Sequence, residues 1–243
     1  MIDALRAAWT LDGAVGTALL DGSADPSDPE AVVERRPERV RALHQAMLDA
    51  GAGAVTAASF AAPRLGAGGA QRVRSAVEAA RSVEPPLVLA ALGPGENHAE
   101  LADVALDAGA DAVVLETFVD VTALVAATVA VRSAIGAGTL LAGFCPLDDL
   151  VDRSLPRRLT DAGADALLLV CGDGEGSVVR WARALAPGPM PVVARPSAGV
   201  PGARRGAAEF GELAHSLREV GVVAMGGCCG ATPAHVAAIA GAR

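Results

Sequence analysis

The sequence contains no lysine and no tyrosine, and aromatic residues make up only 2% of the chain. Without lysine no Schiff base forms on a side chain, which excludes the usual pyridoxal-phosphate and class I aldolase chemistries. The net charge of −8 also leaves no basic surface of the kind that nucleic acids require. We therefore predict an acidic protein that binds no nucleic acid.

Long apolar runs are absent as well. No stretch reaches the roughly 18 apolar residues that a membrane-spanning helix needs, and the longest mildly apolar one, Val121–Val131, contains two threonines. The first residues lack the basic and then apolar order of a signal peptide. We expect a cytoplasmic protein without a membrane partner, whose four cysteines bind a metal, act in catalysis or lie buried instead of forming a disulfide framework.

One short unit recurs along the chain. Asp49–Ala54, Asp107–Ala112 and Asp161–Ala166 are near copies of each other, and Glu219–Val223 is a shorter echo. In each copy a glycine stands where a helix ends in a left-handed cap, and an apolar run follows. The repeat therefore predicts a chain in which helices alternate with buried strands.

Eight short apolar runs are the predicted strands. Their continuous apolar character is typical of parallel strands that are buried on both faces. The alternation favours a (β/α)8 TIM barrel over an open sheet, and the absence of a linker favours a single domain, residues 1–243. The predicted strands are Thr10–Asp12, Ala54–Ser59, Leu87–Leu92, Ala112–Phe118, Thr139–Cys145, Ala166–Cys171, Pro191–Pro196 and Val222–Met225.

Functional side chains of such barrels lie at the carboxyl ends of the strands and in the loops that follow. This rule selects a small set of polar and thiol-bearing residues as candidates. They are Asp12, Thr56, Ser59, Glu116, Thr117, Cys145, Cys171, Ser197 and the loop Gly226–Gly230.

Three cysteines lie at the ends of the sixth and eighth predicted strands. Cys171, Cys228 and Cys229 would form a tetrahedral zinc site with one open position, where zinc would hold a substrate thiol as its thiolate. Two alternatives remain: buried core thiols, or a redox disulfide between the adjacent pair. For Cys145, which has no partner motif, we predict a buried position in the core.

Two carboxylates stand out because of their surroundings. Glu116 interrupts an otherwise apolar strand, and an unpaired buried charge is costly. Pairing with an arginine and binding of a substrate ammonium group both explain it. Asp12 could likewise bind a substrate ammonium group. The alternative is that Asp12 is a turn residue that accepts hydrogen bonds from nearby backbone amides.

Several stretches, in order along the whole chain, resemble motifs of the homocysteine S-methyltransferase family. This family includes betaine- and S-methylmethionine-dependent enzymes and the homocysteine domain of cobalamin-dependent methionine synthase. The most specific stretch is Gly226–His235, which is similar to the family's GGCCGxxPxHI signature. The others are Leu11–Thr17 (DGxxGT), Val55–Phe60 (TTNTF), Gly93–Gly95 (a glycine-rich turn), Glu116–Phe118 (ETF) and Arg195–Pro201 (KPNAGxP).

The resemblance implies a zinc-dependent methyltransferase that converts homocysteine to methionine. It implies that Cys171, Cys228 and Cys229 are the zinc ligands. It also implies that Asp12 and Glu116 bind the ammonium group of homocysteine. The methyl donor is then S-methylmethionine, S-adenosylmethionine, or a corrinoid or folate carrier. Further substrate-binding candidates are Thr56, Ser59 and Ser197, and a homo-oligomer is compatible with the sequence.

The chain departs from the family's pattern in the polar pocket around the cysteines. Ala58 and Ser197 stand where the family has asparagines, and Val170 replaces the asparagine before the first zinc cysteine. Two other functions therefore stay open. One is a catalytically degenerate subunit that binds a thiol or zinc. The other is a phosphate-binding barrel lyase or synthase with Gly226 and Gly227 as its phosphate cradle.

Overall fold

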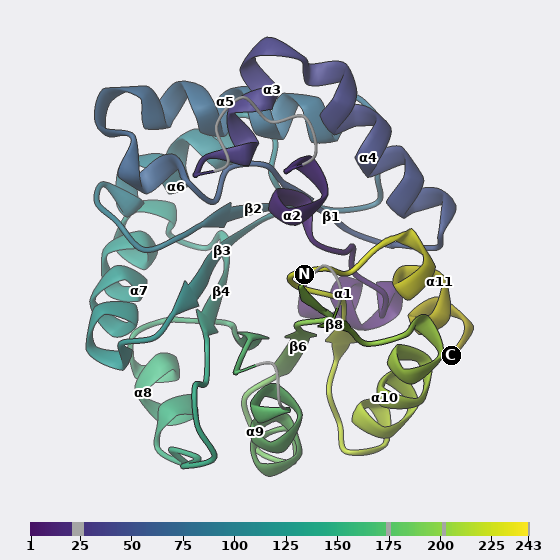
Figure 1. Cartoon of the computed structure of the whole chain (residues 1–243). Coiled ribbons are helices and arrows are strands. Elements are labelled where there is room, and N and C mark those ends of the chain that lie inside the picture. Colours follow the sequence, from purple (N-terminus) through teal and green to yellow (C-terminus); the bar gives the residue numbers. More distant parts are fainter. Residues whose placement is uncertain (21–26, 174–175, 201–202, 243) are drawn as a thin grey trace.

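The protein is described by a computed structural model that covers residues 1–20, 27–173, 176–200 and 203–242. Seven parallel strands form one sheet in the order β1-β2-β3-β4-β5-β6-β9. Figure 1 shows that this sheet is curled and that helices surround its outer face. The strands are β1 (Val55–Ala57), β2 (Val88–Leu92), β3 (Ala112–Phe118), β4 (Thr139–Phe144), β5 (Ala166–Cys171), β6 (Val192–Pro196) and β9 (Ala224–Met225).

A helix follows each of these strands before the next one begins. Two further strands, β7 (Gly199–Val200) and β8 (Ala203–Arg204), form a separate antiparallel pair. The α-helices are α1 (Ile2–Ala8), α2 (Val15–Leu19), α3 (Val32–Arg35), α4 (Pro37–Asp49), α5 (Gly69–Arg81), α6 (His98–Asp107), α7 (Val121–Ile135), α8 (Leu155–Asp161), α9 (Ser177–Leu185), α10 (Ala207–Glu219) and α11 (Pro233–Gly241), and the 3-10 helices are η1 (Pro29–Ala31), η2 (Ala62–Arg64) and η3 (Gly66–Gly68).

The predicted α/β fold with parallel strands is confirmed, and seven of the eight predicted strands are present. The first predicted strand, Thr10–Asp12, is reduced to two isolated parallel bridges. Thr10 pairs with Met225 of β9, and Leu11 pairs with Ala54 beside β1. Trp9, immediately before them, has a φ of 56° and so departs from extended backbone.

The repeated glycine has the predicted role. Gly51, Gly109, Gly163 and Gly221 follow helices α4, α6, α8 and α10, and their φ angles all lie between 97° and 101°. Only glycine adopts this conformation without a steric penalty. The repeat therefore marks four successive points where a helix ends and the chain turns into the sheet.

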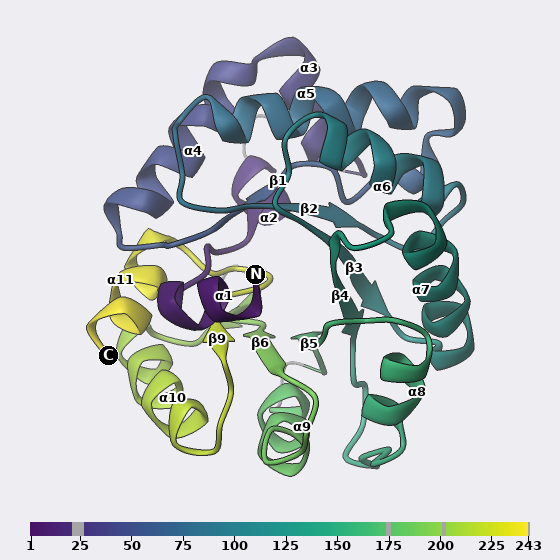
Figure 2. The same cartoon turned by 180° about the vertical axis from the view of Figure 1, so that it is seen from behind.

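Two apolar layers form the core. One lies between the sheet and the outer helices, and the other fills the inside of the curled sheet. Leu5 of α1 belongs to the inner layer together with Leu89, Val114 and Leu168. Figure 2 shows α1 in front of the strands on this side of the molecule. Among the described helices, none is both long and apolar enough to cross a membrane.

Candidate active site

Three cysteine thiols meet at the carboxyl ends of the strands. The sulfur atoms of Cys171 and Cys229 lie 3.7 Å apart, and those of Cys228 and Cys229 lie 3.9 Å apart. All three sulfur atoms are within 4.8 Å of one another. This is the spacing of sulfur ligands that share one metal ion, and the structure thus brings the three predicted ligands together.

Unusual backbone geometry presents these thiols. Cys171 ends β5 with a φ of 63°, a left-handed conformation that is uncommon for a residue with a side chain and is concentrated at functional sites. The loop after β9 approaches other backbone so closely that a Cβ atom on Gly226 would lie 2.7 Å from the Asp12 carbonyl oxygen. Glycine is therefore required where the chain leads from β9 to Cys228.

The thiols share their protons in this arrangement. Hydrogen bonding with the neighbouring thiols, Cys145 first among them, raises the pKa of Cys171. The pKa of Cys229 lies far below its usual value because the thiols of Cys171 and Cys228 donate hydrogen bonds to its thiolate. Cys145 is buried as predicted. Three thiols this close to one another offer the ligands that a thiophilic cation prefers.

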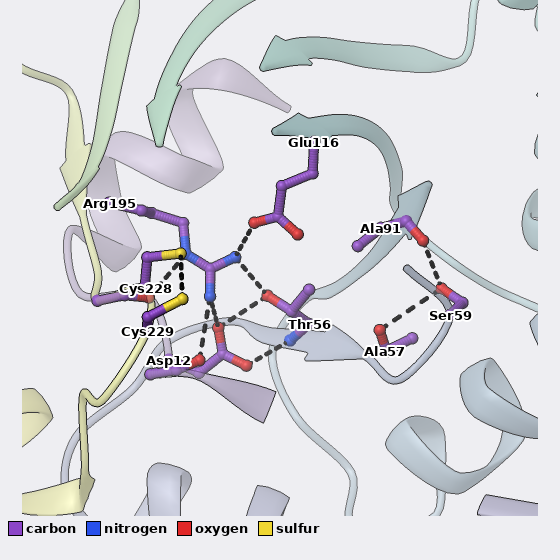
Figure 3. A network of polar contacts seen from close by, with 11 residues as sticks. Asp12, Thr56, Ala57, Ser59, Ala91, Glu116, Arg195, Cys228 and Cys229 are labelled. Carbon is purple, nitrogen blue, oxygen red and sulfur yellow. Dashed lines mark hydrogen bonds and ion pairs between the residues drawn. The ribbon is translucent and has the colours of Figure 1, made fainter. Parts of the chain in front are cut away.

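Arg195, near the end of β6, forms the centre of a buried network beside the thiols (Figure 3). Its two terminal nitrogens donate to Asp12 at 3.1 Å, Glu116 at 3.2 Å and the Thr56 hydroxyl at 3.0 Å. The remaining N–H groups donate to the backbone carbonyls of Gly13 and Gly227. All five guanidinium donors are thus satisfied within the protein.

Sequence reasoning missed Arg195 as a site residue, although it stood in one of the quoted motifs. The signal was present. Arg195 is a lone charge in the apolar strand Val192–Pro196, as Glu116 is in its own strand, and neither charge is stable there without a partner. The two observations together would have predicted the ion pair between them.

Asp12 is the most enclosed member of the network. Its side chain is fully buried, and its oxygens accept hydrogen bonds from the backbone amide of Thr56 at 2.6 Å and from the Thr56 hydroxyl at 2.8 Å. With the bond from Arg195, both carboxylate oxygens have partners. Asp12 therefore joins the first segment of the chain to β1 and β6.

Glu116 is placed differently because of an irregularity in β3. The pairing register between β3 and β4 shifts between Leu115 and Phe118, and a bulge of this kind redirects a side chain. One oxygen of Glu116 pairs with Arg195, whereas the other makes no hydrogen bond to a described residue. Burial raises the pKa of Glu116, although the Arg195 guanidinium acts in the opposite direction.

A cavity of about 350 Å³ lies between the thiols and the Arg195 network on one side and the segment that follows Thr10 and Leu11 on the other. The predicted site residues on its wall, together with Arg195, are Cys171, Cys228, Cys229, Glu116, Thr117 and Thr56.

The other three predicted substrate-binding residues are not among those that line this cavity: Asp12, Ser59 and Ser197. Ser59 donates its hydroxyl proton to the Ala91 carbonyl oxygen at 2.8 Å, and Ser197 accepts a hydrogen bond from the Gly199 amide at 3.0 Å. Both hydroxyls hold the backbone near the site.

The loop after β9 has no amides left for a phosphate cradle at the proposed glycines. Gly226 donates to the Ala194 carbonyl oxygen at 3.0 Å, and Gly227 donates to the Asp12 carbonyl oxygen at 3.0 Å. The Cys228 amide is likewise bonded to the Pro196 carbonyl oxygen, at 2.9 Å. A phosphate group needs free donors at such a site. The geometry therefore disfavours the phosphate-binding alternative.

Comparisons with known proteins agree with this arrangement. The family model "Homocysteine S-methyltransferase" matches residues 9–243. A methionine synthase from Mycobacterium tuberculosis is 30% identical over 95% of this chain, and the one from Mycobacterium leprae is 28% identical over the same share. The chain spans only about a quarter, 24%, of the length of these two relatives.

Solved structures share the fold at low sequence identity. The metallated form of the homocysteine methyltransferase MmuM from Escherichia coli superimposes with a TM-score of 0.76 at 21% identity, covering 96% of this chain and 95% of that one. A methyltransferase from Methanosarcina mazei gives a TM-score of 0.65 at 14% identity, covering 100% and 96%. Since the family model spans nearly the whole sequence, the chain belongs to the homocysteine S-methyltransferase family.

Proposed function

We propose that this chain is a zinc-dependent methyltransferase that moves a methyl group to the thiol of homocysteine and so forms methionine. The observation that carries the proposal is the convergence of three cysteine thiols on the wall of one cavity, in a chain of this family. The same cavity holds a carboxylate with one uncommitted oxygen, at Glu116. Together these groups fit a small substrate that has both a thiol and a cationic group.

The donor set and its dimensions suit zinc. Zinc prefers thiolate ligands at about 2.3 Å, so two sulfur atoms at tetrahedral positions lie about 3.8 Å apart. The sulfur separations of 3.7 Å and 3.9 Å match this value. Three protein ligands with one position open toward a cavity are typical of a catalytic rather than a structural zinc site. Bound zinc would supply a Lewis acid that keeps the substrate sulfur deprotonated at neutral pH.

The residues of the chain then hold and orient the substrate. Arg195 fixes Glu116 and Thr56 at the base of the cavity, because its guanidinium donates to both. The free oxygen of Glu116 is positioned to accept a hydrogen bond from a substrate ammonium group. Asp12 supports this base, because it accepts hydrogen bonds from both Thr56 and Arg195. Positioning of the thiol sulfur in line with the donor methyl group supplies much of the rate.

We also propose that the chain is one domain with a complete (β/α)8 barrel, in which Thr10 and Leu11 act as the eighth strand. The support is that their two bridges reach the strands at both edges of the sheet, Thr10 to β9 and Leu11 to the residue before β1. We further propose that the donor is either a small molecule, such as S-methylmethionine or S-adenosylmethionine, or a corrinoid or folate group on another protein.

Metal content tests the proposal first. We expect about one zinc per chain in reduced wild-type protein and little in Cys228→Ser, as measured by elemental analysis. Cys145→Ser is the matched control, since it removes a buried thiol that contacts Cys171 but is not one of the three clustered ligands. Equal zinc in Cys228→Ser and the wild type would contradict the proposed site.

Turnover tests the second part of the proposal, the transfer of a methyl group to homocysteine. Zinc-loaded protein is assayed for methionine formation from homocysteine with each small-molecule donor and with methylated corrinoid and folate carriers. We expect turnover with one donor class and loss of that turnover in Cys228→Ser. Homocysteine binding without turnover on any donor would support the degenerate subunit instead.

A further inference from the structure

The cavity that the thiols line carries a second buried carboxylate. Glu30 of η1 lines the same cavity as Cys171, Cys228, Cys229 and Glu116, and it is only 6% exposed. Its Oε2 atom accepts one hydrogen bond, from the Ala61 amide at 3.0 Å. Its other oxygen makes no hydrogen bond to a described residue.

No cation neutralises this carboxylate within the part of the chain that the structure describes. The cation whose charge acts on Glu30, Arg72 of α5, pairs with two other carboxylates. Its two terminal nitrogens bond both oxygens of Asp28 at 3.0 Å, and its Nε atom bonds Glu34 at 3.0 Å. Burial raises the pKa of Glu30 to about 7, although the Ala61 amide and the Arg72 charge oppose this shift.

The charges around the cavity therefore do not balance. Arg195 serves two carboxylates, Asp12 and Glu116, and Arg72 serves Asp28 and Glu34, so that Glu30 is the carboxylate without an arginine partner. A buried carboxylate without a counter-ion destabilises the protein that contains it. A ligand that brings a positive charge into this cavity removes that cost.

We propose that Glu30 binds the cationic group of the ligand, while Asp12 acts only as a structural anchor. This inference rests on the proposed function and adds a specificity-determining residue to it. The cation is either the α-ammonium group of the amino-acid thiol or the onium group of the methyl donor. In both cases Glu30 accepts a charge-assisted hydrogen bond or forms an ion pair in the cavity that the thiols line.

The rim of the cavity supports an amino acid as the ligand. Arg64 of η2 also lines the cavity, is exposed, and lies over the ring of Phe60 at 5.3 Å from its centroid. No ion pair to Arg64 occurs among the described residues. Thiolate ligands, an unpaired carboxylate and an unpaired guanidinium on one cavity correspond to the thiol, ammonium and carboxylate of an amino-acid thiol.

Binding measurements separate the role of Glu30 from the proposed function. Zinc-loaded, reduced wild type and Glu30→Gln are titrated by calorimetry at pH 8 with homocysteine and with 4-mercaptobutyrate, which lacks only the amino group. Gln retains an acceptor for the Ala61 amide, so the fold is kept. We expect Glu30→Gln to bind homocysteine at least about tenfold more weakly and to bind 4-mercaptobutyrate as the wild type does.

Glu34→Gln is the matched control, since it neutralises a carboxylate of the same segment that pairs with Arg72 and is not among the residues lining the cavity. It should change neither affinity. If the cation belongs to the donor, Glu30→Gln instead raises the KM for the onium donor and leaves homocysteine binding unchanged. Unchanged thiol affinities and an unchanged donor KM would overturn the role of Glu30. A wild type that binds neither thiol would overturn the proposed function itself.

Discussion

Two buried arginines each hold two carboxylates beside the cavity, but they differ in how completely their partners are enclosed. The Arg195 side chain is 4% exposed, and its partners Asp12 and Glu116 are 0% and 12% exposed. The Arg72 side chain is 3% exposed, whereas its partners Asp28 and Glu34 are 19% and 37% exposed. The carboxylates of the second cluster are thus the more exposed pair.

The two clusters also join different parts of the chain. Arg195 connects segments that are 183 and 79 residues away in sequence, and thereby ties the ends of several strands together. Arg72 connects α5 to the segment around η1, across 44 and 38 residues. The comparison indicates that Arg195 cross-links the strands at the base of the cavity, while Arg72 links the segment that includes Glu30 to a single helix, α5.

The largest expected effect is that of Arg195→Met. The substitution leaves Asp12 and Glu116 buried without a counter-ion, and breaking a buried ion pair in this way costs about 3–5 kcal/mol. We expect the free energy of unfolding of the metal-free, reduced protein to fall by that amount, as measured by urea denaturation. Arg195→Lys keeps the charge but not the five-donor geometry. Its free energy of unfolding should therefore lie between those of the wild type and Arg195→Met. A loss below about 1 kcal/mol for Arg195→Met would contradict the cross-link.

The second effect is a gain in stability. Glu30 has a pKa of about 7 in the folded protein and 4.5 as its usual value. Between these pH values the folded state binds more protons than the unfolded state, so the stability of the wild type falls as the pH rises from about 4.5 to 7. Glu30→Gln has no titratable group at this position, so its stability lacks this pH dependence. At pH 8 it should be more stable than the wild type by roughly 3 kcal/mol, since one pKa unit corresponds to about 1.4 kcal/mol.

Denaturation at two pH values checks this prediction. The stability difference between Glu30→Gln and wild type should be large at pH 8 and should shrink toward pH 5, where Glu30 is protonated in the folded state. A constant difference at both pH values would show that Glu30 is not an unpaired buried carboxylate. A residue that lowers stability at neutral pH and whose replacement weakens ligand binding would have the signature of a binding group.

Arg72→Met should have an intermediate effect. It removes three charge-assisted hydrogen bonds, but Asp28 and Glu34 are partly exposed and regain water. We expect a loss of about 2 kcal/mol, smaller than that of Arg195→Met, in the same denaturation experiment. Equal losses for the two variants would remove the distinction between an enclosed and an open cluster.

The sequence alone was enough to predict the parallel α/β fold and the three converging cysteines. The reason is local: a glycine that must adopt a positive φ marks each helix end, and apolar runs mark the buried strands. Thiols at the ends of parallel strands then meet at one edge. Thr10–Asp12 was overestimated as a strand, since a three-residue stretch with one apolar side chain does not specify how far the pairing extends.

The pairing of charges was harder to predict. For Glu116, both interpretations from the sequence apply at once, because one oxygen pairs with Arg195 and the other remains available at the cavity. Glu30 carried no signal, since it lies in a polar segment with several acids and resembles a solvated residue. Its hydrogen bond from the Ala61 amide joins segments 31 residues apart, which the sequence pattern does not reveal.

The smallest expected effect concerns the Arg72 cluster, whose carboxylates are the more exposed ones. Glu34→Gln breaks one bond of Arg72 to a carboxylate that is 37% exposed, while Asp28 keeps both of its bonds to the same guanidinium. Because water solvates the partners of such a pair, we expect a loss below about 1 kcal/mol in urea denaturation at low salt, and less at high salt. Glu116→Gln is the corresponding change in the enclosed cluster and should cost more. If Glu34→Gln destabilised the protein as much as Glu116→Gln, burial of the partner carboxylates would not be what separates the two arginines.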